Sequence, residues 1–67
     1  MDNFIKTKLI TLLDQEFDKT VANIAGIQKL VDRSKSFTEK AKHVARQAQY
    51  EEYANTLYNL AQQILEA

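Results

Sequence analysis

The stretch Ser34-Lys35-Ser36-Phe37-Thr38-Glu39 separates two long segments of helical periodicity, and it decides the fold. Ser36 followed three residues later by Glu39 has the spacing of a capping box. In that motif the serine hydroxyl accepts the N–H of the glutamate, and the glutamate carboxylate accepts the N–H of the serine. The motif predicts that a helix begins at Phe37. The stretch is therefore expected to be a hinge between two helical arms.

The first arm carries apolar side chains at three- and four-residue steps. They are Ile5, Leu9, Leu12, Leu13, Phe17, Ile24, Ile27, Leu30 and Val31. At about 100° per residue these side chains share one broad face of an α-helix. Asp2 or Asn3 can cap its start. The pattern predicts one helix from about residue 3 to residue 33.

Gly26 lies inside this arm, within the stretch Val21-Ala22-Asn23-Ile24-Ala25-Gly26-Ile27. An alanine four positions before the glycine and an aliphatic residue directly after it resemble the helix-turn-helix motif of bacterial repressors. That resemblance implies a turn at Gly26 and a DNA-reading helix after it. The stretch departs from the family pattern at Asp32, where the recognition helix needs an apolar residue. The unbroken helix is the favoured prediction.

The second arm carries two apolar stripes that point in different directions. The first is made mostly of small side chains, namely Phe37, Ala41, Val44, Ala45 and Ala48. The second is bulkier and comprises Tyr50, Tyr53, Ala54, Leu57, Leu60, Ala61 and Ile64. The stripes are about 180° apart, and no glycine or proline lies near the switch at Gln49. We expect a continuous helix from about residue 37 to residue 66, with its first half packed within the chain and its second half against another chain. A bend near Gln49 is the alternative.

Composition limits how such a chain can be stabilised. Its 67 residues allow one domain, spanning residues 1–67, whose core is small. The absence of cysteine excludes disulfides and thiolate metal sites. Oligomerisation is the remaining way to reinforce a small core. The sequence therefore predicts an all-α helical hairpin that assembles into a homo-oligomeric helical bundle, most simply a homodimer.

Polar residues interrupt the first stripe at Glu16, Thr20 and Asn23, which we call the polar row. The favoured interpretation is a polar layer that fixes the register of a bundle. The alternative is a ligand or partner site, because apolar surroundings raise the pKa of a carboxyl group, and such groups mark functional sites.

Nine basic and nine acidic side chains cancel overall, but the region of residues 29–46 is basic. Its cations, which we call the basic tip, are Lys29, Arg33, Lys35, Lys40, Lys42 and Arg46. The favoured interpretation is a solvated hinge whose cations complement the carboxyl end of the first helix. The alternative is a site for phosphate, nucleic acid or an acidic partner surface. Phe37 is the only aromatic residue among these cations, which disfavours single-strand binding by base stacking.

The side chains that could carry chemistry are few. His43 follows Glu39 by four residues and can share a helix face with it, but a metal site needs a third ligand, so none is predicted. No phosphate-binding loop, nucleophile motif or acid–base pair is present, which predicts a non-enzymatic protein without a cofactor. The residues Tyr50, Tyr53, Leu57, Tyr58 and Ile64 are either core or a partner-binding patch.

These features favour a small regulator or inhibitor that binds a larger protein through a helical face, of the kind that bacteria and phages encode. A nucleic-acid-associated regulator that uses the basic tip is the alternative. The start of the chain has no cationic leader, and no apolar run is long enough to span a bilayer. We therefore expect a cytoplasmic protein with no membrane partner.

Overall fold

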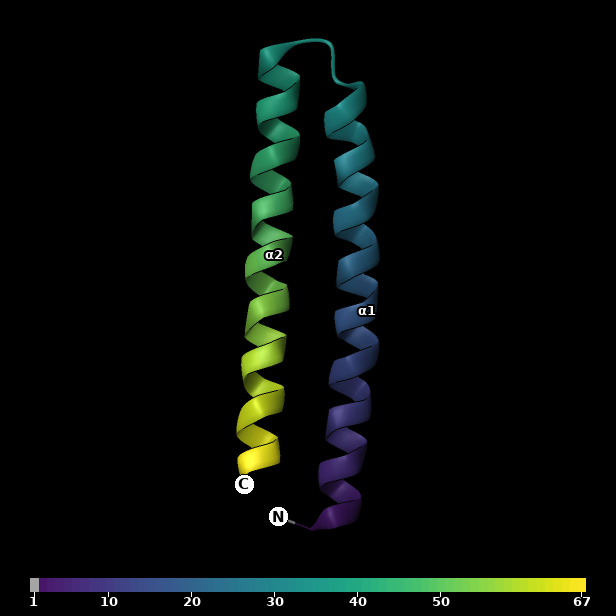
Figure 1. Cartoon of the computed structure of the whole chain (residues 1–67), viewed down its shortest axis with the longest axis vertical. Helices are drawn as coiled ribbons and strands as arrows, with labels where there is room; N and C mark the ends of the chain where they lie inside the picture. Colours follow the sequence, from purple (N-terminus) through teal and green to yellow (C-terminus); the bar gives the residue numbers. More distant parts are fainter. Residues whose placement is uncertain (1) are drawn as a thin grey trace.

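A computed structural model describes residues 2–67, which form two α-helices side by side (Figure 1). Helix α1 spans Asn3–Arg33 and helix α2 spans Phe37–Glu66. The hinge of residues 34–36 joins them at one end, and the start of α1 and the end of α2 lie at the other, which we call the open end (Figure 1). The predicted helical hairpin and its helix bounds are confirmed. Met1, the first residue of the expected domain, lies outside the described residues.

Short polar side chains begin and end the helices. The Asp2 carboxylate accepts the N–H of Phe4 at 2.8 Å, as an N-cap residue does. At the other end of α1 the Ser34 hydroxyl donates to the carbonyl of Leu30 at 2.7 Å. The Ser36 hydroxyl accepts the N–H of Glu39 at 3.1 Å and starts α2.

The capping box predicted at the hinge is only half formed. The Ser36 hydroxyl caps the helix as expected, but the Glu39 carboxylate does not turn back to the Ser36 amide. One of its oxygens lies 3.9 Å from Nε2 of His43, one helical turn further along α2. The expectation that these two residues share a helix face is thereby confirmed.

Replacing Ser36 with alanine is expected to lower the free energy of unfolding by about 1 kcal/mol, the usual worth of an N-cap. For a domain of this size that loss lowers the melting temperature by about 4–8 °C. Thermal unfolding followed by circular dichroism measures the change. Thr38→Ala is the matched control, because Thr38 is exposed and lies past the cap. A larger loss of stability in Thr38→Ala than in Ser36→Ala would show that Ser36 is not the residue that caps α2.

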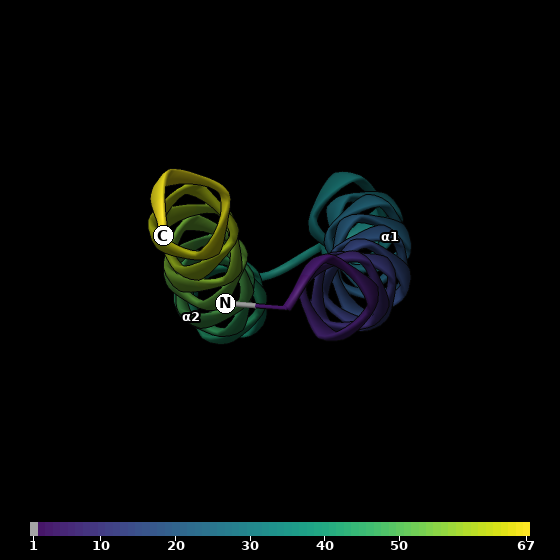
Figure 2. The same cartoon turned by 90° about the horizontal axis from the view of Figure 1, so that it is seen from below.

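The contact between the helices, which we call the seam, follows a regular sequence pattern. On α1 the buried and half-buried residues include Ile10, Leu13, Phe17, Thr20, Ile24, Ile27 and Val31. On α2 they are His43, Gln47, Tyr50, Ala54, Leu57, Ala61 and Ile64. Both sets alternate steps of three and four residues, the spacing of coiled-coil packing. The side view and the view along the long axis show the two antiparallel helices lying side by side (Figures 1 and 2).

Helix α2 continues through Gln49 without a break, as predicted. The assignment of its two halves was wrong, because the bulky second half packs within the chain. Leu57 in that half is 5% exposed, whereas Val44 in the small-residue stripe is 46% exposed. The seam of the first half instead uses His43 and Gln47, which are polar.

Gly26 lies in the interior of α1, with helix on both sides. The turn implied by the resemblance to repressors is absent from residues 3–33, so the helix-turn-helix interpretation is wrong. A Cβ built on Gly26 would meet no atom within 4 Å. The glycine is therefore not required by close packing in the hairpin.

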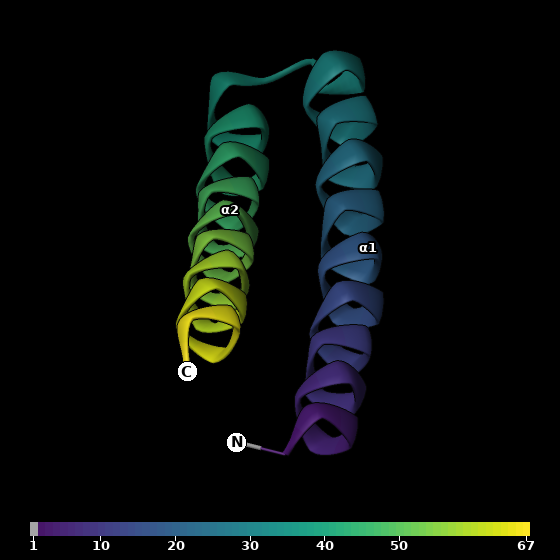
Figure 3. The ribbon, with the colours of Figure 1, turned by 60° about the horizontal axis from the view of Figure 1, so that its bottom comes forward.

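The hairpin is long, thin and poorly buried. It measures 52 × 15 × 9 Å, and α1 extends past α2 at the open end (Figure 3). Among the described residues the buried apolar side chains are Ile27, Ala54 and Leu57. The accessible surface is 5236 Å², about 900 Å² more than a compact protein of this size exposes. One partner in a standard protein interface loses about 800 Å².

Candidate interaction surfaces

Two hydrogen bonds between side chains join the helices within residues 2–67, one on each side of the seam. The Tyr53 hydroxyl donates to a carboxylate oxygen of Glu16 at 3.2 Å. Gln47 donates from its amide nitrogen to the amide oxygen of Gln28 at 2.8 Å. The two bonds therefore mark the two long sides of the hairpin. Both bonds are exposed to solvent.

The predicted polar row divides between the seam and the solvent. Thr20 is 2% exposed, and its hydroxyl donates to the carbonyl of Glu16 at 2.8 Å. Glu16 is half-buried at the seam edge, whereas Asn23 is exposed. Of the three residues, only Glu16 bonds to a side chain of α2, that of Tyr53, within the part of the chain that the structure describes. No side chain of the row is left with a buried, unpaired polar atom among the described residues.

The hydrogen bond to Glu16 changes the acidity of Tyr53. Partial removal of water from the phenol raises the pKa of Tyr53 above its ordinary value of 10.0, and the negative charge of Glu16 and the hydrogen bond raise it further. All three effects disfavour the phenolate. The folded hairpin therefore gains stability from the neutral tyrosine at pH values below 10.0 and loses it as the pH rises through the pKa of the folded state.

Glu16→Gln is expected to move the pKa of Tyr53 back toward 10.0, because the amide keeps a hydrogen-bond acceptor but removes the charge. The difference in ultraviolet titration between wild type and variant isolates Tyr53 from the other two tyrosines. Asp18→Asn is the control, since it removes one carboxylate two residues away. Identical titrations of wild type and Glu16→Gln would show that this carboxylate does not act on the phenol.

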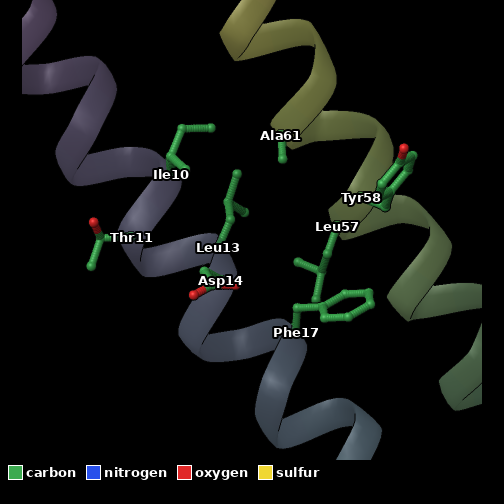
Figure 4. Close-up of a pocket in the computed structure, with 8 residues that line it drawn as sticks. All are labelled: Ile10, Thr11, Leu13, Asp14, Phe17, Leu57, Tyr58 and Ala61. Atoms are coloured by element: carbon green, nitrogen blue, oxygen red, sulfur yellow. The ribbon is translucent and has the colours of Figure 1, made fainter.

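An apolar groove opens on the side of the hairpin opposite Tyr53, which we call the groove side. Its volume is about 320 Å³, and its lining is Ile10, Thr11, Leu13, Asp14, Phe17, Leu57, Tyr58 and Ala61. Leu13, Phe17 and Leu57 point into the space between the helices, whereas Thr11 and Tyr58 lie at the margins (Figure 4). Asp14 is the one charged residue of the lining. The groove can accept one bulky apolar side chain with a cation beside it.

The other long side carries an exposed apolar strip, which we call the leucine face. On α1, Ile5, Leu9 and Leu12 follow one another at steps of four and three residues. Glu16 comes four residues after Leu12 and accepts the hydrogen bond from Tyr53. On α2 Leu60 follows Tyr53 by seven residues, so it stands on the same side. Ile5, Leu12, Tyr53 and Leu60 are all exposed, and Leu9 is half-buried. This strip therefore crosses both helices near the open end.

The five residues expected to form a partner-binding patch are not brought together on one surface. Tyr50, Leu57 and Ile64 lie in the seam, where Leu57 is buried and the other two are half-buried. Tyr53 lies on the leucine face and Tyr58 borders the groove. The leucine face itself was missed because its α1 residues were counted with the core stripe. These α1 residues repeat at three- and four-residue steps, as the seam residues do, but they are displaced around the helix from the seam. That displacement is the signal that separates the two sets.

The six cations of the basic tip are all exposed at or near the hinge. In the part of the chain that the structure describes, none of them forms an ion pair with a carboxylate. His43 is half-buried beside Glu39. No group of three or more metal-ligating side chains occurs among residues 2–67.

The fold and these surfaces define an antiparallel two-helix hairpin with a narrow core, two apolar sides and a basic tip. Comparison of the chain with protein-family models, curated sequences and solved structures finds no match. Within the described residues no helix has the length and apolar character needed to cross a membrane.

Proposed function

We propose that this chain is a small non-enzymatic interaction protein, a regulator or inhibitor that binds a larger protein through a helical face. The leucine face is the observation that carries the proposal. It places exposed aliphatic side chains and Tyr53 on one side of a rigid pair of helices. Exposed apolar side chains gathered on one side of a helix pair are typical of protein interaction sites. Tyrosine adds contact area with a polar tip that needs no full burial.

The proposal includes self-association. Three buried apolar side chains within residues 2–67 are few for a stable core, and exposed apolar residues line both long sides of the hairpin. A chain with two apolar sides can use one for a second copy and the other for a partner. Antiparallel packing of two hairpins gives a four-helix bundle, whose core is larger than that of either hairpin alone.

Leu12→Glu is expected to abolish capture of the partner without unfolding the hairpin, because Leu12 is exposed on the leucine face. The tagged wild type and the variant are used side by side to capture proteins from cell extract, and the captured proteins are quantified by mass spectrometry. Gln15→Glu is the matched control, since it adds the same charge one turn away at an exposed position off this face. A protein bound equally by all three chains would contradict a role for the leucine face.

A nucleic-acid-associated regulator is the second candidate, because the six cations of the basic tip are exposed and free of ion pairs within residues 2–67. Binding to DNA or RNA through these cations would weaken steeply with salt, since each neutralised phosphate releases counterions. Affinity for a DNA duplex and for single-stranded RNA is measured over a salt series. Lys40→Glu with Lys42→Glu is expected to flatten the slope. Absence of binding at low salt would remove this candidate.

A further inference from the structure

We propose that the groove is filled by Phe37 from a second copy of this chain, in a two-fold dimer where each hinge seats on the other's groove. This inference rests on the proposed self-association and names its surface. Phe37 is 88% exposed, more than any other large apolar side chain described. The groove volume of about 320 Å³ exceeds the volume of about 150 Å³ that suffices to hold benzene in an apolar cavity.

Phe37 cannot fill the groove of its own chain. It is the first residue of α2, and Leu57 in the groove follows it by twenty residues along the same straight helix. At 1.5 Å per residue the two are about 30 Å apart. The aromatic ring and the groove can therefore meet only between different molecules.

Phe37 and the groove lie on the same side of the hairpin. Tyr58 borders the groove, and the residues at seven-residue steps before it are Glu51, Val44 and Phe37. Because the seam keeps its seven-residue repeat along α2, residues seven apart stay on one side. A two-fold axis across this side places each phenylalanine over the other copy's groove at the same time. Such a symmetric contact closes on itself and stops at the dimer.

Small side chains occupy the middle of this contact. Halfway along α2 between Phe37 and the groove stand Val44, Ala45 and Ala48, all exposed in the hairpin. Alanines at this position allow the two α2 helices to approach closely near the two-fold axis. The small-residue stripe of α2 thereby gains the neighbour that the seam does not provide.

Charge favours the same arrangement. Asp14 lines the groove, and Asp18 follows it one turn later on the same side of α1. Lys35 and Lys40 flank Phe37 and are exposed. Seating the hinge of one copy on the groove of the other brings these opposite charges together, which steers association and fixes its register.

Phe37→Ala tests the contact in the full-length chain, with association measured by sedimentation equilibrium. Wild type is expected to dimerise, and the variant to dissociate at least roughly thirtyfold more readily, as for removal of a buried anchor. Alanine is a good helix former at this exposed position, so circular dichroism is expected to be unchanged. Leu12→Ala is the matched control, because Leu12 is 52% exposed but stands on the leucine face, on the opposite side of the hairpin.

Charge exchange and cross-linking provide independent readouts. Asp14→Lys is expected to weaken the dimer, and adding Lys35→Glu to restore it. Because the chain has no cysteine, Ala48→Cys is expected to oxidise to a covalent dimer across the two-fold axis, while Gln62→Cys near the open end is not.

The outcomes separate this surface from the broader proposal. A wild type that stays monomeric at all concentrations would overturn both the dimer and the proposed self-association. Dimers that form equally well in Phe37→Ala and Leu12→Ala would overturn only the contact through Phe37. Partner capture by the leucine face does not depend on either result, since it uses the opposite side of the hairpin.

Discussion

Leu57→Asp is expected to unfold the hairpin. Leu57 is 5% exposed in the seam, facing α1 near Phe17. An unpaired charge at such a site costs about 3–5 kcal/mol, and a chain of this length has a total stability of about 3–10 kcal/mol. Far-ultraviolet circular dichroism and thermal unfolding are expected to show loss of most helicity and of the cooperative transition.

Asn55→Asp is the matched control, because it adds the same charge half a turn away at an exposed position. Val44→Asp is a second comparison. Val44 is 46% exposed and lies outside the seam, so the hairpin is expected to keep its helicity even though the change falls in the proposed dimer contact. Retention of full helicity and of the melting temperature in Leu57→Asp would show that the second half of α2 does not pack against α1. The expectation from the sequence, that the second half of α2 packs against another chain, would then be correct.

The helices could be predicted from the sequence because their ends are encoded locally. Asp2 and Ser36 have short side chains that accept hydrogen bonds, and each stands just before a long segment of helical periodicity. No other turn motif lies beside the hinge. The structure uses both side chains as caps. The chain has no proline to break a helix, and Gly26 does not end α1, which continues on both sides of it. The effect of a residue on its own turn of helix can be predicted from the sequence without knowing which helix packs against it.

The choice of seam could not be predicted in the same way, because it depends on the neighbour. Ranking side chains by hydrophobicity selects Val44 and its alanine neighbours in the first half of α2. The structure selects His43 and Gln47 instead. A straight helix must carry one phase along its whole length, and the bulky second half with Leu57 sets it. Long polar side chains tolerate this because their stems pack while their polar ends reach Glu39 and Gln28.

The surfaces were harder still to assign. Leu12 and Ile27 look equivalent in the sequence, since both belong to the broad apolar face of α1. Only the position of α2 leaves Leu12 exposed and buries Ile27. The groove depends on residues from both helices, and so has no signature in either one. Its lining forms only where Phe17 of α1 and Leu57 of α2 face the same space between the helices (Figure 4).

Insertion of one alanine after Glu52 is expected to abolish the cooperative fold, although no residue of the chain is substituted. The insertion rotates every following residue of α2 by about 100° relative to α1. Tyr53 then falls at the buried position of Ala54, and Thr56 replaces the buried Leu57. Removing a buried leucine side chain costs about 2–5 kcal/mol, and forcing a large ring into a small site costs about 1–3 kcal/mol more.

The control is one alanine inserted after Glu66, which lengthens α2 by the same amount but leaves the seam in phase. Thermal unfolding by circular dichroism is measured for both variants at several protein concentrations. Wild-type behaviour is expected for the control, and a low, non-cooperative signal for the internal insertion. Equal melting temperatures would mean that α2 can repack on another face, so that the three- and four-residue spacing from His43 to Ile64 does not specify the hairpin. Loss of cooperativity in the internal insertion alone would establish that spacing as the feature that holds the helices in register.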